Sequence, residues 1–391
     1  MNPDKELGEQ ETLREETEAE VYGAASVTDT AKKYRYCSAP PAPEPSLPSD
    51  RNPDRVRAIV ELAHKWANGT MLRYYFFDKD NDGESVLYRN GDRVWQTWVG
   101  NDNEKDVVRA AFKEWKGLGI GLDFEEVATR DEAEIRIGFM RGDGAWSYLG
   151  TQILDYGPNK RTMNFGWSLL GTDGLDTALH EIGHTLGLPH EHQNPNAGIV
   201  WDEEAVYADL AAPPNQWSRE NTYHNIIRKI PADSVQGSYW DPDSVMHYPF
   251  KAGLIIRPEK FASGLKPNGG LSRRDIAWVK FFYPPIDNDG MVDLMPSQSQ
   301  ELAIKNGEQQ NYLISPPATR YYDIRTFGTC DTAMSLFEMR DNSWRYVTTD
   351  DDSGEDRNAS LRVKLVKERR YALRVRLKYS DTVAMPTIMM W

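Results

Sequence analysis

The sequence has little cysteine and no long apolar run, and each absence excludes a class of protein. Only two cysteines, Cys37 and Cys330, occur in 391 residues, so disulfide bonds cannot form the framework of the fold. We expect two free thiols in a chain that tolerates a reducing compartment, and one bridge between them is the alternative. Because no run of 18 apolar residues exists, we expect no membrane span.

Basic charge is also scarce. The net charge of −14 and the isoelectric point near 5.1 disfavour a general nucleic-acid binder, which usually carries a basic footprint. Residues 1–9 lack the basic start and apolar core of a secretory signal peptide. We therefore expect a cytoplasmic or non-classically exported protein, or a secreted one if a leader precedes this sequence. The oligomeric state is not indicated.

Changes of composition along the chain predict three regions. Residues 1–52 are acidic and then proline-rich, which predicts a disordered tail or a prosegment that covers an active site. Residues 53–285 mix helical and strand patterns and end at Pro284-Pro285, where a helix cannot continue. Residues 286–391 contain short alternating strands with turn signals, which indicate a small all-β sandwich.

Periodicity in the second region predicts several elements. The apolar residues from Val107 to Trp115 lie on one helix face, and Ser272 precedes another helix. Alternation over residues 133–139 predicts a half-buried strand. Further strands are predicted at residues 70–77, 124–127, 144–149 and 162–165.

An acidic stretch at residues 78–83 resembles the start of a calcium loop. Its twelfth position is Arg89, where such a loop needs a bidentate glutamate. We therefore interpret the stretch as an acidic hairpin turn. His64, after an apolar helical pattern, is predicted to be a helix residue outside any functional site.

Histidine is rare as well, and its placement is informative. Three of the seven histidines follow the spacing H-E-x-x-H-x-x-G-x-x-H from His180 to His190. Residues four apart share one helix face, so His180 and His184 can bind one metal ion. Glu181 can accept a proton from water at that metal. Gly187 is suited to end the helix, and the turned chain then returns His190. Three nitrogen ligands and one open position describe a catalytic zinc site.

This motif, the Glu191 that follows it, and residues 244–248 (SVMHY) resemble the astacin family of metzincin zinc endopeptidases. The resemblance covers roughly residues 55–285. It implies an α+β, two-lobed catalytic domain with a twisted, mixed, mostly parallel sheet. It also implies that the helix of the zinc site forms the floor of the cleft between the lobes.

The resemblance further implies roles for individual residues. Met246 would lie in a turn beneath the metal. Tyr248 would be an extra metal ligand that swings away to stabilise the tetrahedral intermediate. Glu191 would pair with a newly cleaved N-terminus. An edge strand would bind the extended substrate antiparallel, and its residues are Gly144, Ala145, Trp146, Ser147 and Tyr148.

The sequence also departs from the family pattern. Asn194 and Asn196 stand where an arginine and an aspartate are usual, so the subsite preference is not carried over. No cysteine lies between residues 53 and 285, so the usual disulfides of the catalytic domain are absent. Residues 322–324, 331–337 and 350–352 resemble the β-sandwich that follows many bacterial peptidases, the pre-peptidase C-terminal domain. Any other small all-β domain is the alternative.

The expected function is that of a zinc-dependent endopeptidase with one Zn²⁺ ion and protein or peptide substrates. Glu181 is the predicted general base and Tyr248 the predicted oxyanion donor. The alternative is a zinc-containing binding protein with a relic site, although such a protein has no need of Glu181. Cys37 is a possible latency ligand, because a thiolate binds zinc well. An ordinary cysteine in a tail is the alternative reading.

Overall fold

The structure is a computed structural model of the chain. It describes residues 34–38, 40, 64–66, 68–88, 91–230, 240–283, 285, 291–302, 304, 309–328, 331–341, 343–351, 353–355, 358–377 and 386–391. Several predicted features lie outside the described residues: most of the acidic and proline-rich region, the helix predicted before residue 64, Arg89 and Cys330. His64 itself lies in a turn.

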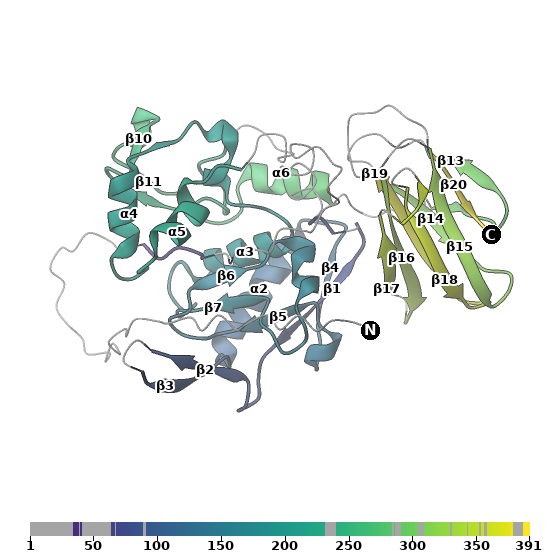
Figure 1. Cartoon of the computed structure of the whole chain (residues 1–391), viewed down its shortest axis with the longest axis horizontal. Coiled ribbons are helices and arrows are strands. Elements are labelled where there is room, and N and C mark those ends of the chain that lie inside the picture. Colours follow the sequence, from purple (N-terminus) through teal and green to yellow (C-terminus); the bar gives the residue numbers. More distant parts are fainter. Residues whose placement is uncertain are drawn as a thin grey trace.

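The first lobe is built on a mixed sheet with the strand order β4-β1-β5-β7-β6 (Figure 1). Its strands are β1 (Met71–Phe76), β4 (Asp123–Glu126), β5 (Ile135–Gly138), β6 (Ala145–Ser147) and β7 (Met163–Phe165). The pairs from β4 to β7 are parallel, whereas β6 pairs antiparallel with β7 at the edge. The predicted mixed sheet is thus confirmed, and its antiparallel strand lies beside the metal-site helix α3 (Gly174–Thr185).

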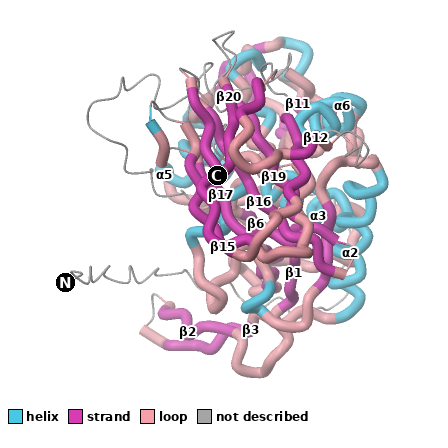
Figure 2. The backbone as a smooth tube through the Cα atoms, turned by 90° about the vertical axis from the view of Figure 1, so that its right-hand side faces the viewer, coloured by secondary structure: helices cyan, strands magenta, loops and turns pink. Residues whose placement is uncertain are grey.

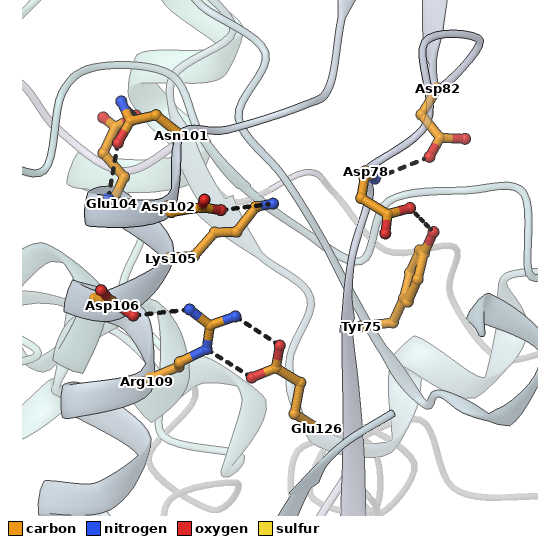
Figure 3. A network of polar contacts seen from close by, with 10 residues as sticks. All are labelled: Tyr75, Asp78, Asp82, Asn101, Asp102, Glu104, Lys105, Asp106, Arg109 and Glu126. Carbon is orange, nitrogen blue, oxygen red and sulfur yellow. Dashed lines mark hydrogen bonds and ion pairs between the residues drawn. The ribbon is translucent and has the colours of Figure 1, made fainter. Parts of the chain in front are cut away.

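The predicted helix around Val107 is α2 (Asp102–Gly117). Its apolar face packs on the sheet, where Phe112 stacks on Tyr74 with ring centroids 4.3 Å apart. Asn101 caps the helix by accepting a hydrogen bond from the amide of Glu104 (Figure 3). The Arg109 guanidinium also joins α2 to the sheet, through a bidentate pair with Glu126 of β4 at 2.7 Å (Figure 3).

Strand β5 corrects the prediction of a half-buried strand, because all four of its residues are buried. One face carries isoleucines of the core, and the other face carries Arg136. The Arg136 guanidinium donates to the carbonyl oxygens of Ala133 (2.8 Å), Lys160 (2.9 Å) and Tyr156 (2.7 Å). A loop therefore covers the face on which an arginine was expected to meet water.

The acidic stretch at residues 78–83 is a turn, but it does not close a hairpin. Strand β2 (Gly83–Leu87), which follows it, pairs with β3 (Arg93–Thr97) and not with β1. The Asp82 carboxylate accepts hydrogen bonds from the backbone amides of Asp78 (3.1 Å, Figure 3) and Lys79 (3.0 Å), and these two bonds stabilise the turn.

The second lobe follows the metal-site helix and consists of short elements. They are β8 (Val200–Trp201), α4 (Glu203–Ala211), α5 (Arg219–Thr222), β9 (Phe250–Lys251), β10 (Ile255–Arg257), β11 (Gly264–Leu265) and α6 (Arg273–Phe282). Short helical turns lie in the first lobe at Arg130–Glu132 and Gly150–Asp155, and in the second lobe at Glu191–Gln193, Pro195–Ala197, Tyr223–Ile227 and Glu259–Phe261. The second lobe has its own aromatic core, which Trp146 of the first-lobe strand β6 joins. Sequence periodicity missed most of it, because short elements bury few residues each.

The C-terminal part is an all-β sandwich, as predicted. One sheet has the order β12-β14-β19-β16-β17 and the other β13-β20-β15-β18. The first contains β12 (Val292–Asp293), β14 (Gln309–Ile314), β16 (Thr332–Arg340), β17 (Ser343–Asp350) and β19 (Tyr371–Leu377). The second contains β13 (Ser299–Glu301), β15 (Arg320–Phe327), β18 (Ser360–Leu365) and β20 (Thr387–Met390). Buried side chains of both sheets form one core.

The sandwich lies beside the first lobe, near β1 and β4 (Figures 1 and 2). The contact centres on Asn68, whose amide donates to Gln309 (3.2 Å) and whose carbonyl accepts from Arg374. Arg345 forms an ion pair with Glu125 at 2.8 Å across the same boundary. Among the described residues, no helix is both long and apolar enough to cross a membrane.

Candidate metal centre

Helix α3 positions two of the three predicted histidine ligands. His180 and His184 lie one turn apart on a buried helix face, with ring centroids 4.7 Å apart. The helix ends in a Schellman motif, in which Leu188 N donates to Gly183 O (3.0 Å) and Gly187 N donates to His184 O (2.8 Å). Gly187 has a φ of +88°, as the predicted stop required.

The chain that leaves Gly187 returns His190 to the same point. Nε2 of His190 lies 3.0 Å from Nε2 of His184. Each ring is oriented by its other nitrogen: Nδ1 of His180 donates to Val245 O (2.7 Å), and Nδ1 of His184 to Leu188 O (2.8 Å). Nδ1 of His190 lies 3.3 Å from Gln193 Oε1. Hydrogen bonds of this kind fix the tautomer in which Nε2 can bind a metal.

These residues fit a zinc ion. One ligand atom from each of His180, His184, His190 and Cys37 can be chosen so that all four lie within 4.8 Å of one another. Nε2 of His180 is buried and has no hydrogen-bond partner in the described part of the chain. Burial lowers the pKa of all three imidazoles, that of His180 to about 4, so they are neutral as zinc ligands must be.

Glu181 and Cys37 lie against this cluster. The Cys37 sulfur is 3.5 Å from Oε2 of Glu181 and 3.6 Å from Nε2 of His184. Burial raises the pKa of Glu181 well above its ordinary value, and the contact with Cys37 opposes that rise. A carboxyl group whose pKa is shifted upward is suited to take up a proton and release it again.

The predicted methionine turn packs beneath the metal-site helix. A Cβ atom on Gly183 would lie 2.4 Å from the sulfur of Met246, so glycine is required for this close approach. Asp275 of α6 holds the turn by accepting from Ser244 Oγ (2.6 Å) and Val245 N (2.8 Å). The Met246 carbonyl accepts a hydrogen bond from the backbone amide of Glu191 at 3.0 Å. This bond joins the turn to the loop that carries His190.

Tyr248 points from the same turn into the cluster. Its hydroxyl donates to the carbonyl oxygen of Cys37 (2.7 Å) and lies 2.6 Å from Nε2 of His190. Burial raises the pKa of this phenol well above its ordinary value, so the group stays protonated and can donate. The Tyr248 hydroxyl therefore lies directly at the cluster of predicted metal ligands.

The predicted substrate strand coincides with β6 at the sheet edge. The carbonyl oxygen of Ala145 accepts the amide of Ser38 at 3.0 Å, and Ser147 Oγ lies 3.1 Å from Thr185 Oγ1 of α3. Gly144, with a φ of +74°, precedes the strand. Trp146 and Tyr148 project towards the aromatic core of the second lobe.

The chain is similar to several known proteins. Residues 94–255 match the model of the peptidase family described as Astacin. Bone morphogenetic protein 1 of Xenopus laevis is 25% identical over 211 residues, which are 49% of this chain and 27% of the relative. Two structures of myroilysin are 29% and 30% identical, cover 57% of this chain and 98% and 86% of theirs, and give TM-scores of 0.48 and 0.41.

The chain belongs to the astacin family. The matched residues 94–255 lie within its first two lobes, which form an astacin-like domain. The C-terminal part is similar to the pre-peptidase C-terminal domain of a collagenase from Bacillus anthracis, at 16% identity, 26% coverage of this chain, 93% of that chain and a TM-score of 0.20. The chain spans about a quarter of the length of the curated relatives it matches.

Two departures from the astacin pattern have structural consequences. Asn194 donates to Oε1 of Glu191 at 3.0 Å, and the same oxygen accepts the amide of Asp241 at 2.9 Å. Burial raises the pKa of Glu191 to about 7. The backbone amide of Asn196 donates to the side-chain oxygen of Asn194 at 2.9 Å. Both asparagines therefore support the loop that follows His190.

Sequence reasoning missed three supporting residues. Gln193 orients His190, Asp275 holds the methionine turn, and Asn215 contacts the segment that contains Cys37. Only Asp275 had a visible signal, since it follows Ser272 by three residues in a capping box. His192, two residues after the third histidine of the motif, is buried, and its Nε2 lies 2.8 Å from Asn225 O.

Proposed function

We propose that this chain is a zinc-dependent endopeptidase that hydrolyses peptide bonds of protein substrates. The observation that carries the proposal is the convergence of three oriented, neutral imidazoles on one point, with Glu181 beside them. When bound, zinc supplies a Lewis acid and lowers the pKa of water toward about 7. His180, His184 and His190 would hold it.

Each residue around the metal has a separate role in hydrolysis. Glu181 takes the proton from the attacking water and passes it to the leaving amine. Tyr248 donates a hydrogen bond to the oxygen of the reacting carbonyl, a contribution worth roughly 10²–10³ in rate. Strand β6 offers its edge to an extended peptide, whose backbone it can pair without regard to sequence.

Replacing Glu181 with glutamine tests the proposal. The Glu181→Gln variant should keep its zinc, because glutamine preserves the shape and Glu181 is not a ligand. It should lose cleavage of an unfolded protein substrate, measured by mass spectrometry of the products. Full activity in this variant would contradict the assigned mechanism. Stoichiometric zinc in the unaltered chain without turnover of any unfolded substrate would favour the alternative of a binding protein with a relic site.

We also propose that Cys37 keeps the enzyme latent by filling the fourth ligand position. The support is the placement of its sulfur, 3.6 Å from His184 Nε2 and 3.5 Å from Glu181. With that position filled, water would have no room beside Glu181.

Substituting cobalt for zinc tests this latency. The cobalt-loaded full chain should show a sulfur-to-metal charge-transfer band, and the Cys37→Ser variant should lack the band and gain activity. Alanine at Ser38, the neighbour of Cys37, is the matched control and should leave the band in place. An identical spectrum and identical activity in Cys37→Ser and the unaltered chain would contradict the proposal.

A further inference from the structure

Residues 34–38 are held in the cleft through their backbone. On one side, Ser38 N donates to Ala145 O of the edge strand at 3.0 Å. On the other side, the Asn215 side chain accepts from Tyr36 N (3.2 Å) and donates to Tyr34 O (3.0 Å). The Asn215 side chain thus binds one backbone amide and one backbone carbonyl of the segment, as the backbone of a neighbouring strand would. Because every one of these contacts uses main-chain atoms of the segment, a peptide of another sequence could make them too.

The side chain of Tyr36 fills an aromatic pocket next to the metal centre. Its ring is 2% exposed and lies 5.2 Å from the ring of Tyr248, 5.9 Å from Phe250 and 6.2 Å from Trp217. The rings of Tyr36 and Phe250 are nearly parallel, at 25°. Since Cys37 follows directly and its sulfur meets the zinc histidines, the pocket is one residue away from the reaction centre.

We propose that this pocket is the main side-chain subsite for substrate and that it selects an aromatic residue close to the cleaved bond. Trp217 determines this specificity, and Asn215 binds the substrate backbone. The proposal rests on the proposed peptidase function. Residues 34–38 occupy the cleft until they are displaced. The contacts of this segment therefore indicate which side chain and which backbone groups the cleft can bind in a substrate.

The polar features of the pocket refine the selectivity. The Tyr36 hydroxyl is buried and finds no hydrogen-bond partner among the described residues. Phenylalanine should therefore be accepted at least as well as tyrosine, because it brings no hydroxyl to be left unpaired. An acidic side chain is disfavoured in this pocket, because the surrounding rings offer no partner to a buried charge.

Trp217 is suited to a test because it is only partly buried and lies in the loop after α4. Its backbone amide donates to Leu210 O at 2.8 Å, so the loop remains anchored when the indole is removed. Tyr223 is a matched control, since it is an aromatic residue of the same lobe whose side chain is 51% exposed.

The experiment uses the zinc-loaded full chain with Tyr36→Ala and Cys37→Ser, which lacks both side chains that fill the cleft. Products from a proteome-derived peptide pool are sequenced by mass spectrometry. We expect phenylalanine, tyrosine and tryptophan to be enriched roughly ten- to hundredfold over aspartate and glutamate at one fixed position within two residues of the cleaved bond. Adding Trp217→Ala should abolish that preference, whereas adding Tyr223→Ala should preserve it.

The outcomes separate this proposal from the function on which it rests. If no peptide of the pool is cleaved, the peptidase function is overturned, and the subsite with it. Cleavage without an aromatic preference, or with a preference that survives Trp217→Ala, would overturn the subsite alone. Asn215→Ala should lower kcat/KM roughly tenfold for all peptides and keep the aromatic preference. A changed preference in that variant would contradict the backbone role of Asn215.

Discussion

At the scale of single residues, burial decides which charge a side chain carries. His64 lies in a turn outside the metal centre, and its Nε2 is 3.1 Å from the Gln152 amide nitrogen, which donates to it. Burial lowers its pKa to about 4. Its sequence context gave no sign of this, because the histidine was expected on a helix. Neutral His64 is thus a consequence of packing, as are the neutral imidazoles of the candidate metal centre.

His64 should make the free energy of unfolding depend on pH. Its pKa is about 4 when folded and near 6.5 when unfolded. Between these values only the unfolded chain binds the proton, so stability is fully present above pH 6.5 and falls as the pH decreases. The stability of the unaltered chain relative to His64→Gln should therefore fall by about 2 kcal/mol between about pH 6.5 and 5. Chemical unfolding of both proteins at equal zinc concentration measures this. A pH-independent difference between them would contradict the assignment.

At the scale of elements, the end of helix α3 determines the geometry of the site. The Schellman motif at Gly187 reverses the chain, and the reversed segment returns His190 to His184. Close packing of the Met246 side chain on Gly183 sets the distance between helix α3 and the methionine turn. The spacing of the motif predicted the helix and its stop. The methionine contact depends on residues about sixty positions apart and needed the folded chain.

The left-handed conformation of Gly187 gives a second prediction. With a φ of +88°, Gly187→Ala should lower the free energy of unfolding by about 1–2 kcal/mol, because a Cβ atom is strained there. Gly187→Asn should lose less, since asparagine tolerates this conformation. Denaturant unfolding of the zinc-loaded proteins measures both. Equal stability of the alanine and asparagine variants would argue against strain as the cause.

At the scale of the whole molecule, a buried arginine joins the sandwich to the first lobe. Arg374 packs its guanidinium 4.3 Å from the centre of the Phe337 ring and donates to the Asn68 carbonyl. Burial lowers its pKa to about 10, so it remains charged at neutral pH. Just before Asn68, Trp66 donates to Thr185 O at the end of α3 (2.7 Å). The segment between residues 64 and 70 therefore contacts both the sandwich and the metal-site helix.

Removing the arginine should loosen this boundary. Arg374→Met should cost about 3 kcal/mol or more, because the Asn68 carbonyl stays buried without its charged donor. We expect faster limited proteolysis between residues 284 and 309 and a separate unfolding transition for the sandwich. Arg345→Ala is the matched control, since its pair with Glu125 is partly exposed and should contribute less than about 1 kcal/mol. Equal effects of the two substitutions would contradict the role of Arg374.

The sequence by itself determined where the candidate metal centre lies. The spacing from His180 to His190 specifies a helix, the end of that helix and three converging imidazoles, because these features depend on residues that are near one another along the chain. The β-sandwich was likewise visible as local alternation. Only the tertiary structure decided that β5 is buried on both faces, that Asn215 and Ala145 hold residues 34–38, and that Tyr36 fills a pocket beside the metal centre. Those features are contacts between distant segments, which no local pattern encodes.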